Sequence, residues 1–185
     1  MKDKQPGLGS RLLIGAIAGF VGTLAMTSAM RRMHERLPRE ERYPLTPREI
    51  IDSTSEQAGV PLPNEAAKDV TTAAHFAYGA ASGALLGAAN VMLGPMSGAT
   101  AGIGVWLGSY MGWIPGVGIL KPANDHPARR NLLMLAAHVV WGVTTAKAMR
   151  ELVAARETIL DEGRDADAPP EGQRPEAADS PLGGR

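Results

Sequence analysis

Residues 70–120 read VTTAAHFAYGAASGALLGAANVMLGPMSGATAGIGVWLGSYMGWIPGVGIL and contain no Asp, Glu, Lys or Arg. Charged residues make up 21% of the whole chain, so a gap of this length is unexpected on composition alone. A soluble domain would expose part of such a segment to water, whereas the hydrocarbon core of a bilayer penalises every charge placed in it. We therefore expect an all-α membrane protein, although the mean hydropathy of the chain, −0.09, resembles that of a soluble domain.

A second uncharged segment runs from Leu12 to Met30, between a basic lead over residues 1–11 and the pair Arg31 and Arg32. About 20 apolar residues cross a bilayer as a helix, and this segment nearly reaches that length. A secretory signal peptide is the alternative interpretation, because a basic lead, an apolar centre and small residues after it are typical of one. The length of the apolar run and the arginine pair that follows it favour a spanning helix.

The charge gap divides at Gly94 and Pro95, a pair that ends one helix and begins another. With almost no chain between them, the second and third spans should form a tight antiparallel hairpin. The sequence thus predicts a polytopic bundle of about four short, glycine-rich transmembrane helices within residues 12–149. The expected spans are residues 12–30, 70–93, 96–114 and 131–149.

The polar connection over residues 31–69 contains the signals of a short helix. Thr46 can cap it, Pro47 suits its first position, Glu49 can close a capping box, and Gly59 can end it. We expect a short amphipathic connector helix on the membrane surface or against the bundle. A solvated connector is the alternative, because the apolar face is only two isoleucines wide.

The C-terminal part of the chain changes character after the fourth predicted span. We expect residues 150–162 to extend that helix into water and residues 163–185 to form a disordered tail, because the tail has almost no apolar mass. Basic residues near the spans divide almost evenly between the two sides, with a small excess opposite the termini. The orientation in the membrane is therefore left open.

Glycines recur at four-residue spacing in three of the predicted spans. Such spacing places them on one helix face and lets a second backbone approach closely. We expect these glycines to pack helices of the same chain together, and contacts with further copies of the chain are the alternative. The predicted packing positions are Gly15, Gly19, Gly79, Gly83, Gly87, Gly98, Gly102, Gly104, Gly108 and Gly112.

Two histidines fall inside predicted spans, His75 near the start of the second and His138 in the middle of the fourth. Ionisable groups in hydrocarbon are costly and often mark proton relays or head-group sites. The alternative, which we favour, is a neutral histidine that donates to a backbone carbonyl. Asn90 and Trp141 complete the candidate polar residues. If both histidines face one cavity with Asn90, a transport role gains support.

Other kinds of site find little support in the sequence. The chain has no cysteine, which excludes disulfides and thiolate metal sites. Its 19 basic and 19 acidic residues balance, so no nucleic-acid partner is indicated. The four histidines form no close pair, and no catalytic motif is present. We expect no metal, no cofactor and no enzymatic activity.

Four short motifs follow one another in a familiar order. They are GAIAGFVGTLAMT at 15–27, PREI at 47–50, HFAYGA at 75–80 and AHVVWG at 137–142. In this order the chain resembles the bacterial YagU-like inner-membrane proteins, a family without an established biochemical activity, over about residues 12–149. The resemblance implies a location in the bacterial plasma membrane and points to His75, His138 and Trp141. It implies no substrate and no catalytic residue.

Three functions are compatible with these features. We expect a non-enzymatic protein whose helices pack with each other, with a partner membrane protein or with copies of the same chain, in envelope maintenance or stress response. A small oligomeric channel or transporter with histidine-dependent gating is the alternative. A lipid-modifying enzyme would need a nucleophile or a metal cluster, and the sequence offers neither.

Overall fold

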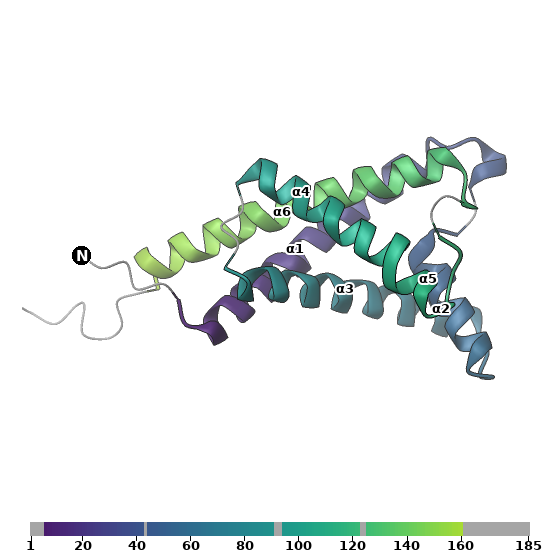
Figure 1. The fold of residues 1–185 in the computed structure, drawn as a ribbon, viewed down its shortest axis with the longest axis horizontal. Helices are drawn as coiled ribbons and strands as arrows, with labels where there is room; N and C mark the ends of the chain where they lie inside the picture. The colour runs from purple at the N-terminus through teal and green to yellow at the C-terminus, as the bar shows by residue number, and fades with distance from the viewer. Residues whose placement is uncertain (1–5, 43, 91–93, 123–124, 161–185) are drawn as a thin grey trace, which may run out of the picture. The chain divides into compact units, whose positions relative to one another are not determined.

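The computed structural model describes residues 6–42, 44–90, 94–122 and 125–160, and within these ranges all regular structure is helical. The chain divides into two compact units, Met1–Val153 and Ala154–Arg185. Figure 1 shows the helices. They are α1 (Leu8–His34), η1 (Arg39–Glu41), α2 (Thr46–Gln57), α3 (Asn64–Ala88), α4 (Pro95–Leu107), η2 (Gly108–Trp113), α5 (Ile114–Gly116) and α6 (Ala128–Thr158). The predicted tail, residues 163–185, lies outside the described residues.

Two of the described helices, α1 and α6, are long and apolar enough to cross a membrane by length and composition. The outward face of α1 is apolar: Leu13, Phe20 and Leu24 are 62%, 51% and 57% exposed. In the first part of the helix the inward face is instead lined by small residues, among them Gly15 and Ala18, and two methionines follow at its end. Helices of soluble proteins turn their large apolar residues inward. The exposed apolar residues of α1 therefore favour contact of this helix with lipid.

The second and third predicted spans correspond to α3 and to the continuous helical stretch from α4 through η2 to α5. They are not among the helices that meet the test that α1 and α6 meet. Helix α4 has only 13 residues before the π-helical η2, and α3 opens with a charged turn. Helix α3 also ends at Ala88, earlier than the predicted Leu93. Asn90 follows it with a positive φ of 54°, and residues 91–93 lie outside the described part of the chain.

Helices α1 and α3 run antiparallel and touch backbone to backbone along a glycine seam. A Cβ atom added to Gly15 would overlap the carbonyl of Gly83, and one added to Gly19 would overlap the carbonyl of Gly79. A Cβ on Gly87 would overlap the carbonyl of Arg11. Only glycine permits this separation, because any larger residue would push the helices apart.

A second seam joins α4 to α6 in the same manner. A Cβ on Gly98 would come within 2.6 Å of the carbonyl oxygen of Gly142, and one on Gly102 would overlap the carbonyl of His138. Gly142, which the four-residue spacing did not single out, faces Gly98 in return. Both seams therefore form within the chain.

The prediction of packing glycines is wrong for the later stripe in the third span. A Cβ added to Gly104 or Gly108 would meet no atom within 4 Å, and one on Gly112 would meet only the carbonyl of Leu107, at 3.7 Å. These glycines share a different side of the helix from Gly98 and Gly102, and that side is exposed. Four-residue spacing identifies a stripe but does not show whether another helix covers it.

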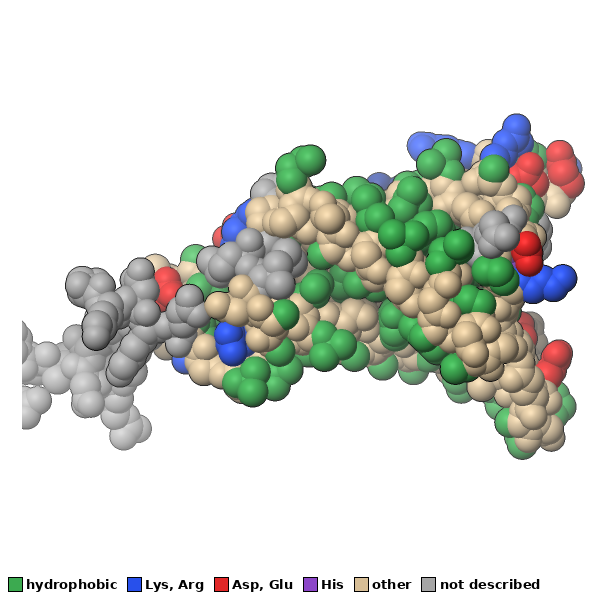
Figure 2. Space-filling model, viewed as in Figure 1, with side chains coloured by type: hydrophobic (Ala, Val, Ile, Leu, Met, Phe, Trp, Pro, Cys, Tyr) green, Lys and Arg blue, Asp and Glu red, His purple; other side chains and the backbone are tan. Residues whose placement is uncertain are grey.

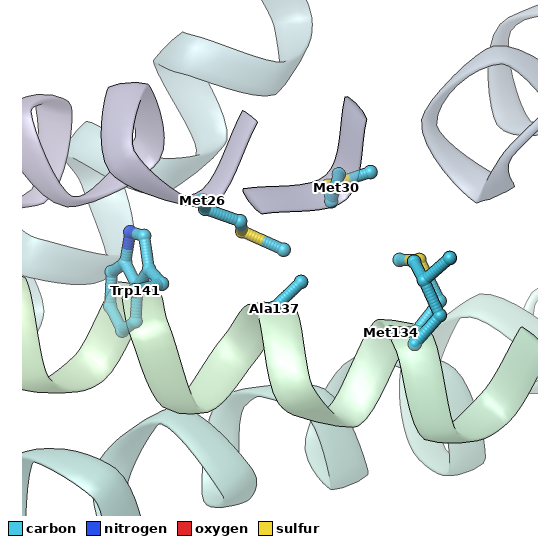
Figure 3. Packing of buried hydrophobic residues seen from close by; sticks show 6 residues of the cluster. Met26, Met30, Met134, Ala137 and Trp141 are labelled. Atoms are coloured by element: carbon cyan, nitrogen blue, oxygen red, sulfur yellow. The ribbon is translucent and has the colours of Figure 1, made fainter. Parts of the chain in front are cut away.

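Helices α1 and α6 meet through larger side chains. Figure 3 shows Met26 and Met30 of α1 facing Met134, Ala137 and Trp141 of α6. All five are buried, with at most 7% of the residue exposed. Figure 2 shows that most charged side chains on the face in view gather at the end that carries η1, α2 and the start of α6. The surface between the ends is hydrophobic or uncharged on that face.

Candidate functional site

A cavity of about 230 Å³ is lined by residues of α1, α2, α3, α4, η2, α5 and α6. None of the described residues that line it is Asp, Glu, Lys or Arg. Its walls are mainly apolar and rich in aromatic rings. The aromatic lining residues are His75, Tyr78, Trp106, Tyr110, Trp113, His138 and Trp141. Such a site is suited to a neutral, largely apolar molecule.

Both candidate histidines line this cavity, although one comes from α3 and the other from α6. The Nδ1 atom of His138 lies 2.8 Å from the carbonyl oxygen of Met134, so a proton on Nδ1 would be donated to the backbone. The Nε2 atom of His75 is buried and has no hydrogen-bond partner among the described residues. The expected static role fits the contacts of His138, whereas His75 has a polar atom without a partner.

Asn90 does not join the histidines. It lies in the turn after α3, is exposed, and is not part of the cavity lining. Its placement inside a span was wrong because α3 stops two residues before it, at Ala88. The positive φ of 54° at Asn90 is a backbone conformation that asparagine tolerates better than most residues, which suits it to a turn.

Trp141 has a packing role in the cavity wall. Its indole N–H donates to the carbonyl oxygen of Gly19 and to the hydroxyl of Thr23, each at 3.2 Å, and only 2% of the residue is exposed. Thr23 in turn donates to the Gly19 carbonyl at 2.8 Å, as its position in the helix predicts. This hydrogen-bonded group connects the glycine seam of α1 to the cavity and fixes the position of Trp141.

Trp106 differs from Trp141 in the hydrogen bonding of its indole N–H. Its ring packs against Tyr110, with the ring centroids 6.1 Å apart, but its buried Nε1 atom has no hydrogen-bond partner in the described part of the chain. An unpaired buried donor costs free energy of about 1–3 kcal/mol. Trp106 Nε1 and His75 Nε2 thus belong to cavity-lining residues but are themselves buried, without a hydrogen-bond partner among the described residues.

The π-helical η2 supplies three cavity residues, Ser109, Tyr110 and Trp113. A short chain of hydrogen bonds joins it to α3: Trp113 Nε1 lies 3.5 Å from the Tyr78 hydroxyl, which lies 2.6 Å from Ser109 Oγ. Ser109 donates to the Val105 carbonyl at 2.6 Å, so Tyr78 donates to Ser109. Short π-helical segments within α-helices are frequent at functional sites.

Helix α2 covers one end of the cavity, where Thr46, Ile50 and Ile51 contribute to the lining. A buried ion pair fixes α2 to α6: Arg130 Nη1 donates to Glu49 Oε1 at 2.9 Å, and its Nη2 also reaches Glu49 and Thr46. The prediction of a capping box was therefore wrong. Leu45 precedes the first turn, no side chain caps it, and the carboxylate of Glu49 is occupied by Arg130.

Further contacts of α2 come from its opposite end. Ser53 donates to the carbonyl of Ile119 at 2.7 Å, and Gln57 donates to the carbonyl of Gly118 at 3.1 Å. The helix is thus held against the bundle at both ends, which agrees with the amphipathic rather than the solvated interpretation of this segment. Neither Arg130 nor Ser53 was singled out by the sequence, because each acts on a residue distant in the chain.

No protein-family model, curated protein or solved structure matches this chain. Within the described residues, no group of three or more His, Asp or Glu side chains could hold a metal ion. The hydroxyl of Ser109 is engaged with the backbone and with Tyr78 and is not paired with a base. The features that bear on function are therefore the cavity and its neutral, mainly apolar lining.

Proposed function

We propose that this chain is a non-enzymatic, multi-pass protein of the bacterial plasma membrane with four spanning helices, whose helices line a binding site for a small neutral molecule from the lipid phase. The observation that carries this proposal is the aromatic cavity of about 230 Å³, whose lining is mainly apolar and includes no charged side chain among the described residues. The resemblance to YagU-like proteins supplies the proposed location.

Four spans are supported by the way the helices pair. If α1 and α6 cross the bilayer, α3 and α4 lie along them through the glycine seams and run antiparallel to them. The uncharged stretch from Val70 to Leu120 covers most of α3 and all of α4, η2 and α5. The seam with α3 also argues against a cleaved leader, because removing α1 would uncover the glycine face of α3.

A cysteine-labelling experiment tests the four-span topology, and the absence of native cysteine makes it clean. We expect Gly9→Cys and Ala89→Cys to react with a membrane-impermeant maleimide from one side of sealed vesicles, and Glu56→Cys and Lys121→Cys from the other. If only α1 and α6 span, Ala89→Cys would label on the same side as Glu56→Cys. Labelling of all four variants after detergent treatment is the control.

Binding is tested with durene, a tetramethylated benzene without polar atoms. Protein in lipid nanodiscs and empty nanodiscs are dialysed against the same durene solution, and the excess in the protein sample is measured by chromatography. We expect about one bound durene per chain at saturation. No excess over empty nanodiscs would contradict the proposed function.

A matched pair of variants locates the bound molecule. Val105 lines the cavity, whereas Leu107 of the same helix is 47% exposed and does not. We expect Val105→Phe to abolish the excess uptake, because the added ring occupies the cavity, and Leu107→Phe to leave it unchanged. Equal effects of both variants would place the durene elsewhere.

The second candidate function is the small channel or transporter with histidine-dependent gating. It is favoured by one observation, that His75 and His138 line the same cavity. Against it, α2 covers one end of the cavity and the lining is mainly apolar. Proton flux into liposomes that is present in the wild type and lost in both His75→Ala and His138→Ala would favour this candidate over simple binding.

A further inference from the structure

We infer that the side chains of Tyr78 and Trp113 form a lateral gate between α3 and η2, through which a small neutral molecule passes between the lipid and the cavity. This inference rests on the proposed function, since it assigns a route of entry to the same site. It follows from three features of this wall, namely the exposure of its side chains, the hydrogen bonds that close it and the light packing of η2.

The wall between α3 and η2 reaches the surface of the molecule. Of the described residues that line the cavity, three are exposed, Ala74 and Tyr78 of α3 and Trp113 of η2. Tyr78 is 41% and Trp113 is 45% exposed, whereas the lining residues Thr23 and Trp141 are at most 2% exposed. A side chain that touches both the cavity and the surroundings separates the two by its own thickness. The enclosure is therefore thinnest at this aromatic pair.

Few hydrogen bonds hold the aromatic pair closed. The two rings lie against each other with their centroids 6.1 Å apart. The Tyr78 hydroxyl donates to Ser109 Oγ at 2.6 Å and accepts from Trp113 Nε1 at 3.5 Å. The second distance is beyond the usual range for an N–H donor, so this contact is weak. One good hydrogen bond and one weak one therefore close the wall, and both involve the same hydroxyl.

The gate lies in the uncharged part of the chain. Tyr78 comes nine residues after Asp69, the last charged residue of α3, and Trp113 comes eight residues before Lys121. At a rise of about 1.5 Å per residue, Tyr78 is about 14 Å along the helix from Asp69, close to the middle of a hydrocarbon core about 30 Å thick. With four spans, the exposed faces of Tyr78 and Trp113 therefore contact lipid, where small apolar molecules are concentrated.

The backbone on the η2 side of the gate is lightly packed. A Cβ atom added to Gly108 would meet no atom within 4 Å, and one added to Gly112 would meet no side chain within that distance. Both glycines are exposed and belong to the π-helical segment that carries Trp113. Glycine also restricts the backbone less than any other residue. The turn that carries Trp113 can therefore move outward without first displacing a neighbouring side chain.

Helix α2 offers the alternative route, because it also lines the cavity. It is held more firmly than the aromatic pair. Arg130 forms an ion pair with Glu49 near its start, and Ser53 and Gln57 donate to backbone carbonyls farther along it. Moving α2 would break these contacts together, whereas opening the gate breaks only the hydrogen bonds of the Tyr78 hydroxyl. The geometry therefore favours entry between α3 and η2.

The exchange rates of a bound probe distinguish the two routes. Hexafluorobenzene is a neutral ring, and fluorine exchange NMR on the protein in nanodiscs measures its association and dissociation rates. Tyr78→Phe keeps the ring and removes the hydroxyl, so we expect both rates to rise about fivefold, the usual effect of one hydrogen bond. A gate acts equally in both directions, whereas the loss of a contact with the bound molecule changes mainly the dissociation rate.

Ser53→Ala is the matched control. It removes one hydroxyl hydrogen bond from α2, and Ser53 does not line the cavity. We expect both rates to stay as in the wild type. Faster exchange in Ser53→Ala but not in Tyr78→Phe would place the route under α2 and overturn the inference. Unchanged rates in both variants, or a change confined to the dissociation rate in Tyr78→Phe, would overturn it as well.

Trp113→Phe supplies an independent variant from the other side of the gate. It removes the weaker hydrogen bond, so we expect both rates to rise by less than about threefold. Should Tyr78→Phe fail to fold, this variant decides the inference, and unchanged rates would overturn it. If the wild-type protein gives no signal from bound probe, the proposed function itself is overturned. Rates that do not respond to the gate variants overturn only the route.

Discussion

The two sides of α3 are built in opposite ways. On one side, Gly83 and Gly87 let the backbone of α1 come so close that no side chain would fit between the two helices. On the other side, Tyr78 and Ser82 line a space that no side chain fills. In lipid, helices associate through close packing of small residues rather than by withdrawal from water. The glycine side therefore provides cohesion, and the aromatic side holds the neighbouring helices far enough apart to leave a cavity.

The largest effect is expected from a substitution that breaks the cohesive side. A side chain at Gly83 would collide with the backbone of Gly15 and Gly19, which no rotamer change relieves. Overpacking costs about 1–3 kcal/mol and more where backbone must move, so we expect Gly83→Leu to lower the free energy of unfolding by about 3 kcal/mol or more. Unfolding in mixed detergent micelles, followed by circular dichroism, measures the change.

Gly104→Leu is the matched control for that substitution. Gly104 lies in another helix of the bundle and has open space around the position of a Cβ atom. We expect little change in stability, because a leucine there faces outward. If both substitutions cost the same, the difference between covered and uncovered glycines described above is wrong.

A smaller effect is expected where α2 covers the cavity. Only 4% of the Arg130 side chain is exposed, against 26% for Glu49, so Glu49→Gln leaves a buried guanidinium without its partner charge. Such a loss costs about 3–5 kcal/mol for a fully buried pair, and we expect about 2 kcal/mol here because Glu49 is partly solvated. Thermal unfolding and hydrogen exchange of the α2 amides would both report it.

The control for this prediction is the exposed pair between Arg129 and Glu41. The side chain of Arg129 is 66% exposed, so Arg129→Met should change the stability by less than about 1 kcal/mol. An equal effect of Arg129→Met and Glu49→Gln would show that burial of Arg130 is not what makes its ion pair important.

The smallest of the three effects is expected at Trp141, which links α6 to α1 beside the glycine seam. Trp141→Phe keeps a ring in the core but removes the hydrogen bonds to Gly19 and Thr23. We expect a loss of about 1 kcal/mol in the free energy of unfolding, the usual net contribution of one hydrogen bond. A loss as large as that of Gly83→Leu would mean that the link, and not the glycine seam, provides the cohesion.

The glycine side of α3 could be predicted from the sequence because it depends on the local spacing of residues. Gly15 and Gly19 are one helical turn apart, as are Gly79 and Gly83, and a turn is readable from neighbouring residues. Which stripe is covered is not readable in this way. The stripe of Gly104 and its neighbours has the same spacing and is open, because its environment depends on where α6 and α3 lie.

The contacts around the cavity were much harder to predict from the sequence. The ion pair between Glu49 and Arg130 joins residues far apart in the chain, and the predicted capping box used the same carboxylate in a local contact. The π-helical η2 has no signal that we recognise in the residues Gly108–Trp113. The histidines could be named as candidates, but their meeting in one cavity depends on the packing of α3 against α6.

The π-helical η2 also makes the geometry depend on the number of residues in this stretch. A π-helical turn contains more residues than an α-helical one, and successive residues of an α-helix are about 100° apart around the axis. If Gly108–Trp113 formed a regular α-helix with the same number of residues, everything after it would be rotated about the helix axis, including Ile114 and the Ile119 carbonyl that accepts from Ser53. Deleting one residue together with the π-helical turn would instead keep that orientation. In homologous chains without the π-helical turn, this stretch should therefore be one residue shorter.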